Sequence, residues 1–228
     1  MGGTCGTALQ AAVRENREGM AKLLLARGAD INLVGGEHGT PLQDAAARGR
    51  IVLVEFLLGK GADVNVEGGK YGTALQAACS GPSKLKTVTE LLARGAKVKT
   101  NCGQYGNPLQ AAVHEDDVKI VKTLLEHGAD VNQAGGQYGY PLQAAVSSHS
   151  CDPENLEILQ LLLDEGADVN AQGGEFGTAL QAAAYHHRQY VEILLEHGAN
   201  KSITGGKYGS AFGAAKEKGL RRVMKLLS

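Results

Sequence analysis

The sequence predicts an all-α solenoid of stacked helix-turn-helix units, each with a short protruding β-hairpin or turn. A glycine-rich segment that runs into Leu-Gln-Ala-Ala or a close variant recurs seven times along the 228 residues. The residue after its last glycine recurs at steps of 33, 33, 34, 33, 38 and 32. Tryptophan is absent and aromatic residues are 4% of the chain, so Leu, Val, Ile and Ala must fill the core. A near-constant period of this length is typical of repeat arrays, in which each unit packs on its neighbours.

The repeats are continuous, with no linker and no shift in composition between them. We therefore interpret residues 1–228 as one domain. Its units cover approximately residues 1–33, 34–66, 67–100, 101–133, 134–171, 172–203 and 204–228, and are numbered 1 to 7 below.

The glycine-rich segment, for example GGKYGTALQAA at 68–78, looks at first like a phosphate-binding loop. Such a loop needs a lysine or hydroxyl at a fixed offset. Here the residue after the glycine pair is Glu37 in unit 2 and Lys70 in unit 3, and its charge changes sign along the chain. Glycine accepts positive φ without penalty, so we expect tight hairpin tips instead of nucleotide sites.

Two helices are predicted to follow each hairpin. A Thr with a Gln three residues later, as in Thr40 and Gln43, forms a capping box, and Pro41 suits the first helical position. The second helix carries apolar residues at helical spacing and ends at a glycine such as Gly128. We expect this glycine to be a left-handed C-cap.

The units resemble a known family. Thr-Pro-Leu-x-x-Ala occurs in unit 2, and LLLARGADIN, FLLGKGADVN, LLEHGADVN and LLDEGADVN occur in units 1, 2, 4 and 5. These motifs resemble ankyrin repeats and cover essentially the whole chain. Gln replaces the family's usual His after Pro-Leu, and the hairpin reads Gly-Gly-x-aromatic-Gly. Both departures are similar to a variant common in large fungal repeat proteins.

The resemblance implies an ankyrin-like α-solenoid that binds a protein partner on its concave surface and hairpin tips, without catalysis. The side chains that vary between units lie at the hairpin and at the end of the first helix. The candidate partner-binding residues are His38, Arg48, Lys70, Tyr71, Gln104, Tyr105, His114, Glu115, Gln137, Tyr138, Ser147, Ser148, Glu175, Phe176, Tyr185 and His186.

The hairpin aromatic residues allow two interpretations. Five of the ten aromatic residues occupy this one offset, including Tyr208 in unit 7. They form either a structural ladder, in which each ring packs on the neighbouring hairpin, or a stripe that contacts a partner, because exposed Tyr is favoured at interfaces. The two roles can coexist.

Composition and motifs argue against other classes of function. The net charge of -1 does not favour nucleic acid or an anionic membrane, and no run is apolar enough to span a bilayer. No nucleophile and base recur together, so we expect no enzyme, no cofactor and no small-molecule substrate. The scattered cysteines show no metal-ligand spacing and no signal peptide is visible, so we expect an intracellular, cytoplasmic protein, with the nucleus also open.

Two units depart from the pattern. Unit 5 has an insertion over residues 147–157, in which the spacing of His149, Cys151 and Asp152 fits no standard metal site. Asp152 and Pro153 are better interpreted as the start of the second helix. In unit 3, Lys97 and Lys99 replace the usual Asp and Asn, and form either a solvated face or a basic spot for an acidic partner.

The sequence is also compatible with two other functions. The repeats could be the sensor or autoinhibitory segment of a larger multidomain switch protein. They could also be an engineered or consensus-like scaffold, although the uneven unit lengths argue against an idealised design.

Overall fold

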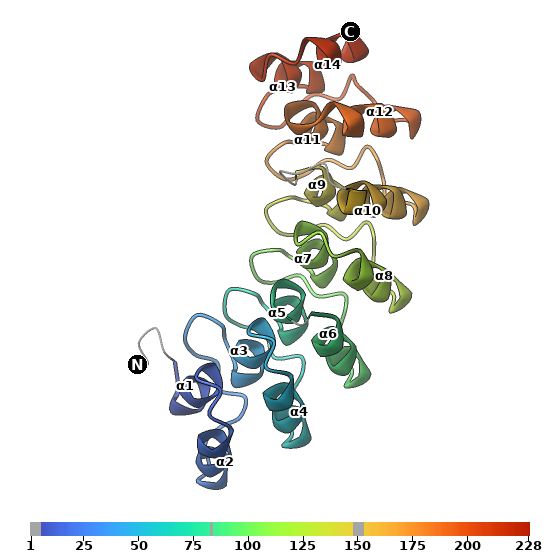
Figure 1. The fold of residues 1–228 in the computed structure, drawn as a ribbon. Coiled ribbons are helices and arrows are strands. Elements are labelled where there is room, and N and C mark those ends of the chain that lie inside the picture. Colours follow the sequence, from blue (N-terminus) through green and yellow to red (C-terminus); the bar gives the residue numbers. More distant parts are fainter. Residues whose placement is uncertain (1–5, 83, 148–152) are drawn as a thin grey trace.

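The structure, a computed structural model, describes residues 6–82, 84–147 and 153–228. It confirms the predicted solenoid: seven helix pairs stack in a single curved file (Figure 1). Odd-numbered helices form one column, and even-numbered helices form a second column (Figure 1). The hairpins project beside the odd-numbered column, so we call the odd-numbered helices inner and the even-numbered ones outer.

Each unit contributes one inner and one outer helix. The inner helices are α1 (Ala8–Arg14), α3 (Pro41–Ala47), α5 (Ala74–Ser80), α7 (Pro108–His114), α9 (Pro141–Val146), α11 (Ala179–His186) and α13 (Ala211–Glu217). The outer helices are α2 (Glu18–Ala26), α4 (Ile51–Gly59), α6 (Lys84–Ala93), α8 (Val118–Glu126), α10 (Pro153–Asp164), α12 (Arg188–Glu196) and α14 (Arg221–Leu227).

The predicted capping boxes start the inner helices. The Gln43 amide N–H donates to Thr40 Oγ1 at 3.2 Å, and the Thr40 amide N–H donates to Gln43 Oε1 at 2.5 Å. The same reciprocal pair is present at the start of α1, α5 and α11. Two of the four amide groups that a helix start leaves without an internal partner are satisfied in this way.

The predicted glycine C-caps end the outer helices. Gly128 follows α8 with φ of 82°. Its amide N–H donates to the Leu125 carbonyl at 2.9 Å, and the Ala129 amide N–H donates to the Leu124 carbonyl at 3.0 Å. This pair of bonds is the Schellman arrangement, which turns the chain sharply away from the helix.

The hairpins stack on one another through their backbones, which the sequence interpretation did not foresee. In units 2 to 7, the second residue of this Gly-Gly or Cys-Gly pair is a glycine with positive φ, as at Gly103 with 68°. A Cβ atom on Gly103 would lie 2.2 Å from the Tyr71 carbonyl oxygen of the preceding hairpin. The Gln104 amide N–H donates to the Lys70 carbonyl at 2.8 Å. Glycine is therefore needed here for close approach as well as for the turn.

The core is a continuous apolar layer between the two helix columns. The inner helices contribute a Leu with an exposed fraction of 1% in most units, as at Leu42, Leu75 and Leu109. Buried alanines such as Ala77 and Ala111 surround these leucines. Small side chains let neighbouring inner helices lie close together, so each unit buries its apolar face against the next unit.

The capping glutamines also join neighbouring units, so the explanation of Gln by its capping box alone was incomplete. Gln43 Nε2 donates to the Gly72 carbonyl of the next unit at 2.8 Å, and Gln110 Nε2 donates to the Gly139 carbonyl at 3.0 Å. We define the glutamine ladder as this set of buried side chains, which bond across every junction between units. Its members are Gln10, Gln43, Gln76, Gln110, Gln143 and Gln181.

A second set of bonds joins the loops that follow the outer helices. Asn65 Nδ2 donates to the Gly95 carbonyl at 3.0 Å, and its Oδ1 accepts from the Lys97 amide N–H at 2.9 Å. We define the asparagine ladder as Asn32, Asn65, Asn132 and Asn170, all with exposed bonds. Lys99 takes the equivalent position in unit 3, so this ladder is interrupted between units 3 and 4.

Candidate protein-interaction surface

The candidate residues of unit 2 surround a buried carboxylate that the sequence analysis did not single out. Asp44, on α3, has a side chain that is 1% exposed. His38 Nδ1 lies 2.6 Å from Asp44 Oδ1, and Arg48 Nε lies 2.7 Å from the same atom. Arg14 Nε of unit 1 lies 3.4 Å from Asp44 Oδ2. The sequence did contain a signal for this site, because unit 2 has Leu-Gln-Asp-Ala where the other units have Leu-Gln-Ala-Ala or Phe-Gly-Ala-Ala.

The hairpin of unit 3 carries an exposed ion pair. Lys70 Nζ lies 2.6 Å from Glu37 Oε1 of unit 2, and 4.9 Å from the centre of the Tyr71 ring. The hydrogen bond and charge of Lys70 lower the pKa of Glu37 below its usual value. The Tyr71 ring lies 5.6 Å from the His38 ring of the preceding hairpin. These contacts tie the tips of the two hairpins together.

In unit 4 the inner-helix histidine lies between two hairpin tyrosines. The His114 ring centre is 5.0 Å from Tyr105 and 5.4 Å from Tyr138. Tyr138 Oη and His114 Nδ1 are 2.9 Å apart and share a hydrogen bond. Tyr105 is only 8% exposed, and burial raises the pKa of its hydroxyl. Tyr105 therefore offers a partner little surface, whereas Gln104 beside it is exposed.

Glu115, the last candidate of unit 4, lies at the C-terminal end of α7. Its Oε2 atom is 3.4 Å from Lys84 Nζ of unit 3. Lys84 begins α6, so this ion pair joins the end of an inner helix to the outer helix of the preceding unit. The pair is partly exposed at the surface.

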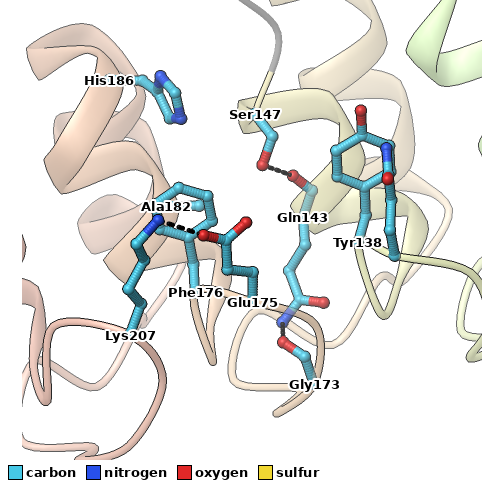
Figure 2. A pocket seen from close by; sticks show the side chains of 10 residues that line it. Tyr138, Gln143, Ser147, Gly173, Glu175, Phe176, Ala182, His186 and Lys207 are labelled. Atoms are coloured by element: carbon cyan, nitrogen blue, oxygen red, sulfur yellow. Dashed lines mark hydrogen bonds and ion pairs between the residues drawn. The ribbon is translucent and has the colours of Figure 1, made fainter.

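A cavity of about 300 Å³ opens between the hairpins of units 5, 6 and 7. Figure 2 shows Gln143 and Ser147 between Tyr138 on one side and the Glu175–Lys207 ion pair on the other, with His186 above. The lining residues are Gln137, Tyr138, Gln143, Ser147, Gly173, Glu175, Phe176, Ala182, His186 and Lys207. Six candidate residues thus meet at one site, together with Gln143, Gly173, Ala182 and Lys207, which were not predicted.

Hydrogen bonds from side chains to backbone carbonyls hold part of the cavity lining in place. The Ser147 hydroxyl donates to the Gln143 carbonyl at 2.7 Å, and Gln143 Nε2 donates to the Gly173 carbonyl at 3.2 Å (Figure 2). Ser147 is buried at the end of α9, so it lines the cavity and does not project from the surface. Ser148 and the insertion residues His149, Cys151 and Asp152 lie outside the described residues.

Unit 6 continues the surface with an aromatic cluster. The Tyr185 ring of α11 stacks on Tyr208 of the next hairpin, with ring centres 4.8 Å apart and planes at 13°. Lys218 Nζ lies 4.3 Å from the centre of the Tyr185 ring. The hydrogen bond with Tyr208, and next the hydrogen bond with Lys218, lower the pKa of Tyr185 below its usual value. The same hydrogen bond with Tyr185 raises the pKa of Tyr208. Phe176 packs against this cluster, with its ring centre 5.5 Å from Tyr185.

These distances bear on the predicted aromatic ladder. The hairpin rings do pack together, but several contacts run through inner-helix residues such as His114 and Tyr185 and not directly between hairpins. Packing of an exposed ring does not prevent it from binding. Contact of Tyr138 and Phe176 with a partner stays a prediction.

Within residues 6–82, 84–147 and 153–228, no three His, Cys, Asp or Glu side chains are placed to hold a metal ion, and no helix is long and apolar enough to cross a membrane. The Cys79 thiol is fully buried on α5, and burial raises its pKa to about 12.

Comparisons with known proteins agree with the repeat pattern. The family model described as ankyrin repeats (3 copies) matches in four overlapping stretches, residues 3–68, 42–135, 74–173 and 139–205. Among solved structures, the chain is similar to the crystal structure of the human ASB11 ankyrin repeat domain. The TM-score is 0.76 at 26% sequence identity, over 97% of this chain and 98% of that one. No curated protein matches the sequence.

Proposed function

We propose that this chain, which belongs to the ankyrin repeat family, is a non-catalytic scaffold that binds a protein partner along its hairpins and inner-helix ends. Ankyrin repeats are in general protein–protein interaction modules, and the family is typically non-catalytic. The observation that carries the proposal is the cavity at units 5 to 7. Six residues that the sequence analysis chose as candidates, from the hairpins and the ends of the inner helices, line this one cavity.

A rigid framework supports this surface. The hairpins are joined by backbone hydrogen bonds, such as that from the Lys207 amide N–H to the Glu175 carbonyl at 3.0 Å. The glutamine ladder fixes each inner helix to the following hairpin. A preorganised surface loses little conformational entropy on association, so more of the contact free energy appears as affinity.

Site-specific photo-crosslinking during affinity capture tests the binding surface. A photo-reactive amino acid replaces Gln137 at an exposed hairpin tip, or Gln160 on the exposed face of α10 as a matched control. We expect a covalent adduct with the captured partner from position 137 and none from position 160. Adducts from position 160 alone would overturn the proposed function.

A pair of charge variants sharpens the same test. Gln104→Arg with Gln137→Arg changes two exposed hairpin tips, and Gln160→Arg with Gln189→Arg makes the same change on outer helices. We expect the hairpin variant to lose partner capture at least about tenfold, a change of about 1.4 kcal/mol, and the outer-helix variant to retain it. Equal capture by the two variants would contradict a hairpin-centred interface.

A further inference from the structure

We propose that the cavity of units 5 to 7 receives one apolar side chain from an extended acidic segment of the partner protein, whose carboxylates lie beside Lys218. This inference rests on the proposed function and specifies the chemistry of the partner. Neither the family nor the similarity to a solved ankyrin domain defines what this cavity accepts.

The size and lining of the cavity indicate a single inserted side chain. Its volume of about 300 Å³ is at the lower end of the range for small-molecule sites. The rings of Tyr138 and Phe176 and the methyl group of Ala182 contribute apolar surface. Both rings are half-buried, so they are held in place before any partner arrives.

The polar groups around this apolar lining suit an extended peptide. Gln137 is exposed on the unit 5 hairpin and His186 lies at the end of α11, and both border the cavity. Amide and imidazole groups can bond to the backbone of a bound segment. Glu175 is the carboxylate that borders the cavity, and its ion pair with Lys207 offsets its negative charge.

Unit 7, next to the cavity, is strongly basic. Residues 204–228 contain six Lys or Arg and a single acidic residue, Glu217, in a chain whose net charge is -1. Lys218 has an exposed side chain and lies over the Tyr185 ring. Among the described residues, no carboxylate forms an ion pair with Lys218. A carboxylate of the partner would supply this missing counter-charge.

The same charges argue for a peptide over a single-stranded nucleic acid. Stacked tyrosines near lysines are also found where bases bind. However, a nucleic acid would carry a phosphate for each base along the hairpins, where Glu175 is exposed and borders the cavity. The cavity accepts one apolar group and not a row of bases. An acidic peptide can place its carboxylates near unit 7 alone and its apolar side chain in the cavity.

Fluorescence anisotropy with labelled synthetic peptides tests this inference on the full chain. The probe is a peptide of glutamates around a single central Phe, and the comparison peptides carry Gly in place of Phe or lysines in place of glutamates. We expect the Phe probe to bind at least about tenfold more tightly than the Gly peptide, because Phe buries apolar surface. The lysine peptide and a labelled oligouridylate should not bind measurably.

Two exposed charge variants identify where the acidic probe binds. Lys218→Glu should weaken binding of the Phe probe at least about tenfold, whereas Lys60→Glu at the end of α4 should leave it within about twofold. Phe176→Ala should reduce the difference between the Phe and Gly peptides. Circular dichroism and thermal melting check that this half-buried substitution leaves the fold intact, and Lys218→Glu tests the inference independently of it.

The outcomes separate this inference from the proposed function. Binding of the lysine peptide or oligouridylate as tight as that of the Phe probe would overturn the acidic segment, as would equal losses for Lys218→Glu and Lys60→Glu. Crosslinking from position 137 would still support the proposed function in that case. Crosslinking from position 160 alone would overturn the proposed function, whatever the peptides do.

Discussion

The two side-chain ladders differ in burial and in continuity. The glutamine ladder lies between inner helices and hairpins, is buried, and bonds across all six junctions from Gln10 to Gln181. The asparagine ladder lies in the loops that follow the outer helices, is exposed, and is interrupted at Lys99. Both ladders perform the same task, which is to satisfy backbone groups of the next unit with a side-chain amide.

The difference shows how burial decides which positions tolerate change. A buried carbonyl that loses its donor keeps the full cost of its desolvation, whereas an exposed one bonds to water instead. Lys99 is therefore tolerated in the exposed ladder. At the same junction, Gln133 Nε2 donates to the Thr100 carbonyl at 2.8 Å and joins units 3 and 4 in another way.

The largest expected effect comes from filling the contact between two hairpins. Gly103→Ala should lower the free energy of unfolding by about 3 kcal/mol, because its Cβ would strike the Tyr71 carbonyl and its φ is positive. Urea melts followed by circular dichroism measure the change.

Gly128→Ala is the matched control for this substitution on the loop side. It has a similar positive φ, but nothing lies within 4 Å of its Cβ position. We expect a loss of about 1 kcal/mol, since only the left-handed conformation is penalised. Equal losses for the two variants would show that hairpin contact adds nothing to the conformational cost.

A smaller effect is expected from removing one member of the buried ladder. Gln76→Ala should cost about 2 to 3 kcal/mol, because it removes a helix cap and the donor to the Cys102 carbonyl. Asn65→Ala removes two exposed bonds to the next unit and should cost about 1 kcal/mol or less. Chemical denaturation of both variants compares the ladders, and a larger loss for Asn65→Ala would contradict the role of burial.

The smallest expected effect repairs the interrupted ladder. Lys99→Asn should raise the free energy of unfolding by about 0.5 kcal/mol, because the new amide can reach the Gly128 carbonyl and the Asp130 amide N–H. Thermal melting compares it with Lys97→Asn, a change of the same chemistry two residues away. If both variants melt at the same temperature, an Asn at the ladder position stabilises the fold no more than an Asn two residues away, which would contradict the prediction.

Variability between units, together with the resemblance to a known family, predicted the candidate surface at the hairpins and the ends of the inner helices. The sequence could not show that Tyr105 is buried while Gln104 is exposed, because both occupy the same hairpin and neither residue type determines exposure. It also missed the role of Asp44, whose three partners come from two units and are brought together only by stacking.

The sequence by itself determined the repeat period, because one segment recurs along the chain. It also determined the capping boxes and the glycine C-caps, because each cap depends on residues a few positions apart. Stacking decided the rest. The bond from Gln43 to Gly72 and the approach of Gly103 to Tyr71 join residues about one repeat apart, and the cavity beside Phe176 joins residues of three units. Their geometry depends on how closely one unit lies on the next, and packing of the Leu and Ala layer sets that distance only in the folded chain.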